Sequence, residues 1–267
     1  MTNTDTHAHE VSSSPVEIEI RGQVAIIWLN RPNQRNSINL GLTTGLRDAI
    51  RQVEENPDLR VAILAGRGEA FCADMDLKAF DAGDHHDIIF GEGRFAGFVD
   101  LPRRKPIIAA VHGFALAGGF ELMLACDMVV AGESSQFGVP EACVGLFAAA
   151  GGCFRLAARM PLVKAKELVL TGTMITAKEA LQYGLLNHLV LDDQVLDRAL
   201  KLADGILACA PLSVEMGLEL TKSAATSQET EIWEQNNALF AKVLNSNDAK
   251  EGARAFIEKR SPVWTGT

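Results

Sequence analysis

The stretch IIAAVHGFALAGGFELMLA, residues 107–125, holds the pattern that decides the fold. A short apolar run, 107–111, leads through the turn His112-Gly113 to the glycine pair Gly118-Gly119. Such a run is typical of a strand buried on both faces of a sheet, and the glycine pair begins a predicted helix over 117–125. Glycines at a helix start leave backbone N–H groups uncovered, where a developing oxyanion can bind, but they also permit close packing of helix on sheet. The stretch alone leaves these two interpretations open.

The same alternation extends outward from this stretch. Residues 16–21 and 24–29 predict a hairpin, 40–55 a helix, and 61–65 and 128–131 further strands. This rhythm indicates an α/β fold. From residue 162 onward helical periodicity dominates, and the expected helices span 162–170, 177–183, 195–207, 212–225, 230–245 and 247–258.

No Pro/Gly/Ser-rich linker divides the chain near residue 160, where its character changes. We therefore expect one domain with a helical extension. Its parts are a disordered lead-in over 1–15, a core over 16–195 and a helical C-terminal region over 196–267.

Composition excludes several classes of partner. The 267 residues carry 25 Lys and Arg against 34 Asp and Glu, a net charge of −9, which argues against nucleic acid or an anionic membrane surface. No apolar run approaches the roughly 20 residues of a membrane-spanning helix. The five cysteines form no CxxC pair, and the N-terminus has no apolar signal segment. A cytoplasmic protein with free thiols is expected.

Two other stretches resemble ligand-binding motifs only weakly. The sequence Gly66-Arg67-Gly68 follows a predicted strand as in a dinucleotide fingerprint, but Phe71 stands at the third glycine position. His85 and His86 lie among acidic residues and are interpreted as part of a solvated loop. No metal site is predicted.

Two glutamates have apolar flanks. Glu121 follows the glycine pair and Glu141 follows Pro140, so either could simply complement a helix dipole. That interpretation does not explain why both have apolar neighbours. Two carboxyl groups kept out of bulk water are pushed toward different protonation states, which supplies one base and one acid.

Four segments together match a known family: Ala62–Gly66, Ala70–Leu77, Gly113–Leu122 and Phe137–Glu141. They resemble the crotonase (enoyl-CoA hydratase/isomerase) family, closest to its enoyl-CoA hydratase and carnitinyl-CoA dehydratase-like members. The resemblance runs in consistent order from about residue 16 to 264. It implies a spiral of ββα units with a C-terminal helical trimerisation region, an acyl-CoA thioester substrate, and a homotrimer or dimer of trimers. No cofactor is implied beyond the coenzyme A of the substrate.

The resemblance also implies roles for four residues at the reacting centre. The backbone N–H groups of Met75 and Gly118 would bind the thioester oxygen. Glu121 and Glu141 would act jointly as base and acid in the reversible hydration of 2-enoyl-CoA to 3-hydroxyacyl-CoA, with Glu141 preferred as the donor to the α-carbon.

Further residues are implied along the coenzyme A. Arg35 and the backbone of Ala73 and Met75 would contact it, while Phe256 and Lys259 would reach the coenzyme A of a neighbouring subunit. For Arg35, an ordinary solvated surface cation is the alternative.

One position departs from the family pattern. The loop reads Ala73-Asp74-Met75-Asp76, with Asp74 where the family has glycine. Either Asp74 turns away and the oxyanion hole survives, or the hole is distorted and hydration is weak. The departure keeps a weakly active or non-catalytic acyl-CoA binder open. An enoyl-CoA isomerase, which needs one carboxylate, and a carnitinyl-CoA dehydratase, which residues 75–80 resemble, also stay open.

Overall fold

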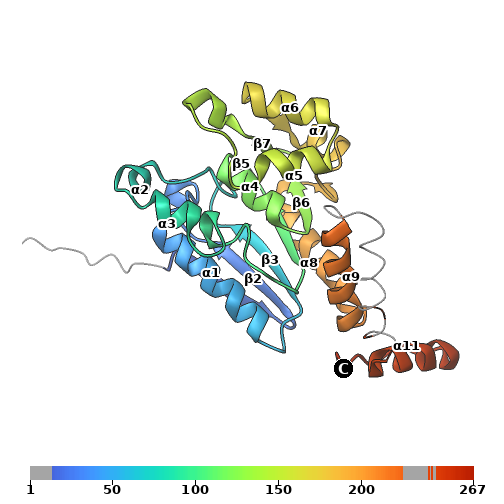
Figure 1. Ribbon diagram of the computed structural model, residues 1–267. Helices are drawn as coiled ribbons and strands as arrows, with labels where there is room; N and C mark the ends of the chain where they lie inside the picture. Colours follow the sequence, from blue (N-terminus) through green and yellow to red (C-terminus); the bar gives the residue numbers. More distant parts are fainter. Residues whose placement is uncertain (1–13, 225–239, 241, 243–244) are drawn as a thin grey trace, which may run out of the picture.

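The large sheet forms the centre of the molecule (Figure 1). The protein is described as a computed structural model over residues 14–224, 240, 242 and 245–267. The strand order of the sheet is β1-β2-β3-β4-β6-β9; β1 is antiparallel to β2 and the other neighbours are parallel. The strands are β1 (Val16–Arg21), β2 (Val24–Leu29), β3 (Val61–Gly66), β4 (Ile107–Val111), β6 (Met128–Gly132) and β9 (His188–Val190). The predicted hairpin and central strands are confirmed.

A smaller sheet has the order β5-β7-β8, formed by β5 (Phe114–Leu116), β7 (Gln136–Gly138) and β8 (Ile175–Thr176). Along the chain, β4 and β6 lie in the large sheet, and each is followed directly by a strand of the small one. The spiral therefore alternates between two sheets. The sequence predicted neither β5 nor β7, because strands of three residues are too short to show a period.

Both faces of the large sheet are covered. Helix α1 (Leu40–Glu55) packs on β1 and β2, while α8 (Val195–Leu207) packs on β3, β4 and β6. Successive β3 residues alternate between these two cores: Leu64 belongs to the cluster that includes α1, and Ile63 to the cluster that includes Ala199 of α8. This explains why the strand is a continuous apolar run.

The helices after residue 160 match the prediction in most places. The strands β8 and β9 interrupt this part, which the sequence indicated only as helical, and most of the expected helix over 230–245 lies outside the described residues. The helices not named above are α2 (Leu77–Asp81), α3 (His85–Phe90), α4 (Gly118–Ala125), α5 (Gly152–Arg159), α6 (Leu162–Thr171), α7 (Ala177–Gln182), α9 (Pro211–Ala224) and α11 (Asn247–Glu258). The short 3₁₀ helices are η1 (Pro32–Gln34), η2 (Phe95–Gly97), η3 (Pro140–Val144) and η4 (Asp192–Gln194).

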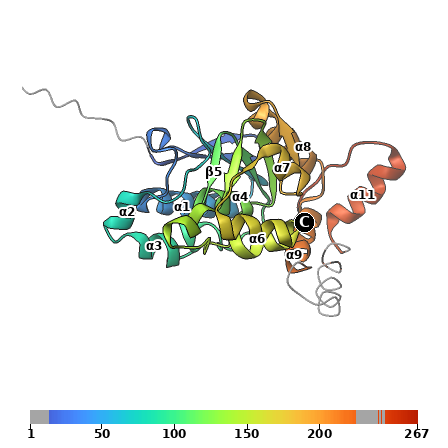
Figure 2. The same cartoon turned by 90° about the horizontal axis from the view of Figure 1, so that it is seen from above.

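Helix α11 lies apart from the large sheet, on the side of the molecule opposite α2 and α3 (Figures 1 and 2). Within the part of the chain that the structure describes, no helix combines the length and apolarity needed to cross a membrane. The predicted lead-in lies almost wholly in residues 1–13, outside the described residues, and the division at 195 stays a prediction.

Candidate active site

The loop over 72–76 runs beside strand β5. The Cys72 N–H donates to the Phe114 carbonyl at 3.1 Å, and the Leu116 N–H donates back to the Cys72 carbonyl at 3.1 Å. This ladder extends the small sheet by one bridge. It holds the loop directly before the first turn of α4. Asp74 and Gly118, which are 44 positions apart in the sequence, are therefore in contact.

The other side of the loop pairs with residues 35–38. The Ala73 N–H donates to the Arg35 carbonyl at 3.0 Å, and the Ile38 N–H donates to the Asp74 carbonyl at 2.8 Å. The Asp76 N–H then donates to the Ile38 carbonyl at 2.8 Å. Arg35 and Ala73, both expected along the coenzyme A, are therefore neighbours in the fold.

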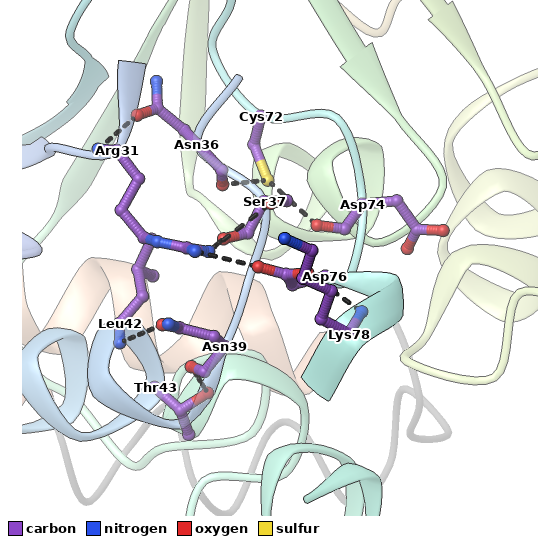
Figure 3. A network of polar contacts seen from close by, with 10 residues as sticks. All are labelled: Arg31, Asn36, Ser37, Asn39, Leu42, Thr43, Cys72, Asp74, Asp76 and Lys78. Atoms are coloured by element: carbon purple, nitrogen blue, oxygen red, sulfur yellow. Dashed lines mark hydrogen bonds and ion pairs between the residues drawn. The ribbon is translucent and has the colours of Figure 1, made fainter. Parts of the chain in front are cut away.

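Side chains reinforce this pairing (Figure 3). The Arg31 guanidinium donates to the Ser37 carbonyl and forms a half-buried ion pair with Asp76 at 2.8 Å. Hydrogen bonding to Arg31 lowers the pKa of Asp76 against the opposing effect of burial. The Asp74 side chain points away from this ion pair in Figure 3. Hydrogen bonds and this ion pair thus fix the backbone of the loop, while the Asp74 side chain lies on the side away from the ion pair.

The Asp74 carboxylate lies at one of the two predicted oxyanion-hole donors. The Gly118 N–H donates to Asp74 Oδ1 at 3.0 Å. The Met75 backbone favours the charged form of the same carboxylate. Asp74 has a left-handed backbone with φ of 91°, the conformation that favours glycine. Of the two outcomes left open for Asp74, the structure does not show the one in which its side chain turns away, because its carboxylate accepts the Gly118 N–H.

Burial raises the pKa of Asp74, and the backbone of Met75 and Gly118 partly offsets that effect. Gly118 itself leaves no room for a side chain, because a Cβ there would lie 2.3 Å from Phe95 Cζ. The glycine thus allows α4 to begin against the Phe95 ring with its first N–H group directed at the loop.

Glu121 lies in the first turn of α4 and is 3% exposed. Its Oε1 accepts a hydrogen bond from the Gly152 N–H at 2.8 Å, and the Ala150 backbone also stabilises the charged form. Burial nevertheless raises the pKa of Glu121 to about 8, with a further contribution from the negative charges of Glu141 and Asp74. This carboxyl is fixed in position, and its raised pKa allows it to gain or lose a proton near neutral pH.

Glu141 lies in the first turn of η3 and is 8% exposed. Burial, followed by the charge of Asp74, raises the pKa of Glu141 to about 7. Its Oε2 is buried and has no hydrogen-bond partner among the described residues. The structure therefore brings Glu121, Glu141 and Asp74 within electrostatic reach of one another, and an unpartnered acceptor belongs to this group. Carboxyl groups with pKa values near neutrality can exchange protons in either direction.

Gly152 was missed in the sequence. It begins α5, and a Cβ there would lie 2.7 Å from Ala148 Cβ and 3.0 Å from Glu121 Oε1. The signal was present in the run AAAGG over 148–152, a glycine pair at a helix start of the same kind as Gly118-Gly119. Its partner, Glu121, could not be read from that run.

The remaining predicted contacts are scattered within one chain. Arg35 is exposed beside Ala73, whereas Lys259 follows α11, on the far side of the molecule from α2 (Figure 1). The side chain of Phe256 lies outside what the structure describes. Contacts of Phe256 and Lys259 with a neighbouring subunit's coenzyme A stay predictions. Within the described residues no cluster of His, Cys, Asp or Glu could hold a metal ion.

Comparison with known proteins places this geometry in a family. The family model for enoyl-CoA hydratase/isomerase matches residues 19–267. A carnitinyl-CoA dehydratase of Proteus mirabilis is 38% identical over 260 residues, 95% of this chain and 99% of that protein. An enoyl-CoA hydratase of Mycobacterium tuberculosis is 42% identical over 250 residues, 92% of this chain and 94% of that protein.

A solved structure agrees with these relatives. The crystal structure of an enoyl-CoA hydratase from Mycobacterium tuberculosis matches with a TM-score of 0.92 and 44% identity, over 96% of this chain and 100% of that chain. The predicted resemblance is confirmed, and so is the expectation of a hydratase or dehydratase on the crotonase scaffold. The chain belongs to the enoyl-CoA hydratase/isomerase family.

Proposed function

We propose that this chain adds water reversibly to the double bond of 2-enoyl-CoA thioesters, giving 3-hydroxyacyl-CoA. The observation that carries the proposal is the convergence of two buried carboxyls, Glu121 and Glu141, with two backbone donors, Met75 and Gly118. The names of the relatives support the same reaction class.

In the proposed reaction, the thioester oxygen accepts hydrogen bonds from the Met75 and Gly118 N–H groups. These donors stabilise the enolate-like charge that builds up as water attacks the β-carbon, an effect worth about 3 kcal/mol per donor in comparable sites. One carboxylate takes a proton from the attacking water, and the other carboxyl gives its proton to the α-carbon. We assign these roles to Glu121 and Glu141 jointly, with Glu141 preferred as the α-carbon donor.

A second candidate is dehydration of carnitinyl-CoA. The Proteus mirabilis relative has this name and covers 95% of this chain. The same two carboxyls would run the reaction toward loss of water. Enoyl-CoA isomerisation would need only one of them. A weakly active or non-catalytic acyl-CoA binder is supported by the position of Asp74.

The test is turnover of crotonyl-CoA by the full chain, followed by loss of enoyl-thioester absorbance and by mass spectrometry of the hydrated product. A panel with 3-enoyl-CoA and carnitinyl-CoA separates hydratase, isomerase and dehydratase. Glu121→Gln and Glu141→Gln should each slow hydration by orders of magnitude but retain binding of butyryl-CoA. Glu133→Gln, at an exposed position, is the matched control. Unchanged rates in both active-site variants would refute the proposal.

We further propose contacts of the coenzyme A with Arg35, Ala73 and Met75, and with Phe256 and Lys259 of a neighbouring subunit. A homotrimer or dimer of trimers, joined in part by the C-terminal helices, would supply that neighbour. Exposed apolar side chains support self-association, and light scattering of the purified chain tests it. They include Val144, Phe147, Phe154, Val163 and Leu170.

We also propose that the reaction uses no metal or redox cofactor and takes place in the cytoplasm. The five free cysteines support a reducing compartment.

A further inference from the structure

The oxyanion hole of this chain holds one of the chain's own carboxylates. Asp74 Oδ1 accepts a hydrogen bond from the Gly118 N–H at 3.0 Å, and the Met75 backbone favours the charged form of the same carboxylate. These are the two donors that the proposed reaction assigns to the thioester oxygen. One N–H proton cannot serve both acceptors with good geometry.

We propose that the Asp74 carboxylate is an internal ligand of the oxyanion hole, which an acyl-CoA thioester must displace before it can bind productively. This inference rests on the proposed function for the identity of the thioester. It assigns Asp74 a regulatory role at that site: the residue sets how strongly the site discriminates against carbonyl-bearing ligands.

The competition favours the internal ligand in the free protein. An ionised acceptor makes stronger hydrogen bonds to backbone N–H groups than a neutral carbonyl does. The internal carboxylate also loses no translational freedom when it binds. A displaced Asp74 gains no ion pair, because the described residues form none with it and its titratable neighbours Glu121 and Glu141 are themselves acidic.

Displacement does not require the loop to unfold. The Asp74 carbonyl accepts from the Ile38 N–H, and the Asp76 N–H donates to the Ile38 carbonyl, each at 2.8 Å. These bonds hold the backbone on both sides of residue 74. Rotation of the Asp74 side chain alone can therefore open the hole while Met75 and Gly118 stay in place.

A matched pair of ligands tests the competition without turnover. Butyryl-CoA has a thioester carbonyl, whereas S-butyl-CoA is a thioether of the same chain length that lacks the carbonyl. Isothermal titration measures both Kd values for the wild type, Asp74→Gly, Asp74→Asn and the charge-matched control Asp81→Asn. Asp81 is exposed at the end of α2.

Asp74→Gly should lower the Kd of butyryl-CoA about tenfold to a hundredfold, the range expected when one or two charge-assisted hydrogen bonds no longer compete. S-butyl-CoA should change by less than about twofold, because it does not use the hole. Asp74→Asn should lie between the wild type and Asp74→Gly, and Asp81→Asn should match the wild type for both ligands.

An equal decrease in the Kd of both ligands in Asp74→Gly would mean that removing a negative charge strengthens coenzyme A binding in general, and it would overturn the inference. Unchanged butyryl-CoA affinity would overturn it as well. The outcome is independent of catalysis: selective tightening without hydration by any variant would sustain the internal ligand and refute the proposed hydratase. Hydration without selective tightening would do the reverse.

Discussion

The two ends of the candidate site are built in opposite ways. At the carbonyl end, the Gly118 donor is occupied by Asp74 Oδ1, and the Met75 backbone favours the charged form of that carboxylate. At the acid–base end, Glu121 is held by Gly152, whereas Glu141 keeps a buried oxygen with no partner among the described residues. A hydrogen-bond donor at the carbonyl end already has a partner within the protein, whereas an acceptor at the acid–base end has none among the described residues. A sequence can therefore contain the donors and acids of its family without showing which of them are available to the substrate.

The largest expected effect concerns the acid–base end. Glu121→Gln and Glu141→Gln should each reduce kcat for crotonyl-CoA by about 10² to 10⁴-fold, because each removes a group that transfers a proton. The double variant should be little slower than either single variant, since the two act as a unit. Steady-state kinetics measure all three. A multiplicative double loss would show that the two carboxyls act independently.

Gly152→Ala should reduce kcat about tenfold to a hundredfold with a smaller change in KM. The added methyl group would lie 3.0 Å from Glu121 Oε1 and 2.7 Å from Ala148 Cβ, so the hydrogen bond that positions Glu121 must shift. Gly205→Ala, in α8 where a Cβ meets nothing within 4 Å, is the control. A variant with normal kcat would show that Glu121 needs no such support.

At the carbonyl end, Asp74→Gly should raise kcat/KM for crotonyl-CoA by about tenfold or more, because the donors become free for the thioester oxygen. The gain should be absent in Asp81→Asn. An unchanged or lower value would mean that Asp74 is harmless or useful during turnover.

The raised carboxyl pKa values also predict a pH dependence of stability. The folded pKa of Glu121, about 8, lies above its ordinary value of 4.5, so the folded state binds more protons over this window. Its contribution to the free energy of unfolding is fully present below about pH 4.5 and is lost as pH rises to 8. Glu121→Gln removes this loss, so its Tm relative to wild type should rise between pH 5 and pH 8 by the equivalent of about 1 kcal/mol or more.

Thermal melts of Glu121→Gln and of the exposed control Glu133→Gln at several pH values check this expectation. A parallel pH profile for Glu121→Gln and wild type would show that the Glu121 carboxyl titrates normally.

The smallest expected effect isolates the backbone at residue 74. Asp74→Ala and Asp74→Gly both remove the carboxylate, but only glycine suits a φ of 91° without strain. The glycine variant should be more stable by about 1 kcal/mol in denaturant unfolding. Equal stabilities would indicate that the loop relaxes once the carboxylate is gone.

The sequence predicted the fold where patterns are local. The continuous apolar run at 61–65 indicated a strand buried on both faces, and both faces are indeed covered. Strands β5 and β7, of three residues each, escaped because their pairing is set by neighbours far along the chain. Tertiary contacts, not propensity, make these segments strands.

In the candidate site too, only the features set by neighbouring residues could be predicted from the sequence. The apolar flanks of Glu121 and Glu141 indicated buried carboxyls, and both are buried. The direction of the Asp74 side chain could not be predicted, because one of the donors that hold it, Gly118, lies 44 residues away. Nor could the bond from Gly152, which comes from 31 residues beyond Glu121.

The backbone pairing through Ile38 confines any change at residue 74 to a single side chain. Codons for aspartate and glycine differ at one base. A single-base change is therefore enough to convert a filled oxyanion hole into an open one without altering the backbone. During evolution, an enzyme with a blocked hole could become one with a free hole by a point mutation, with no compensating change elsewhere.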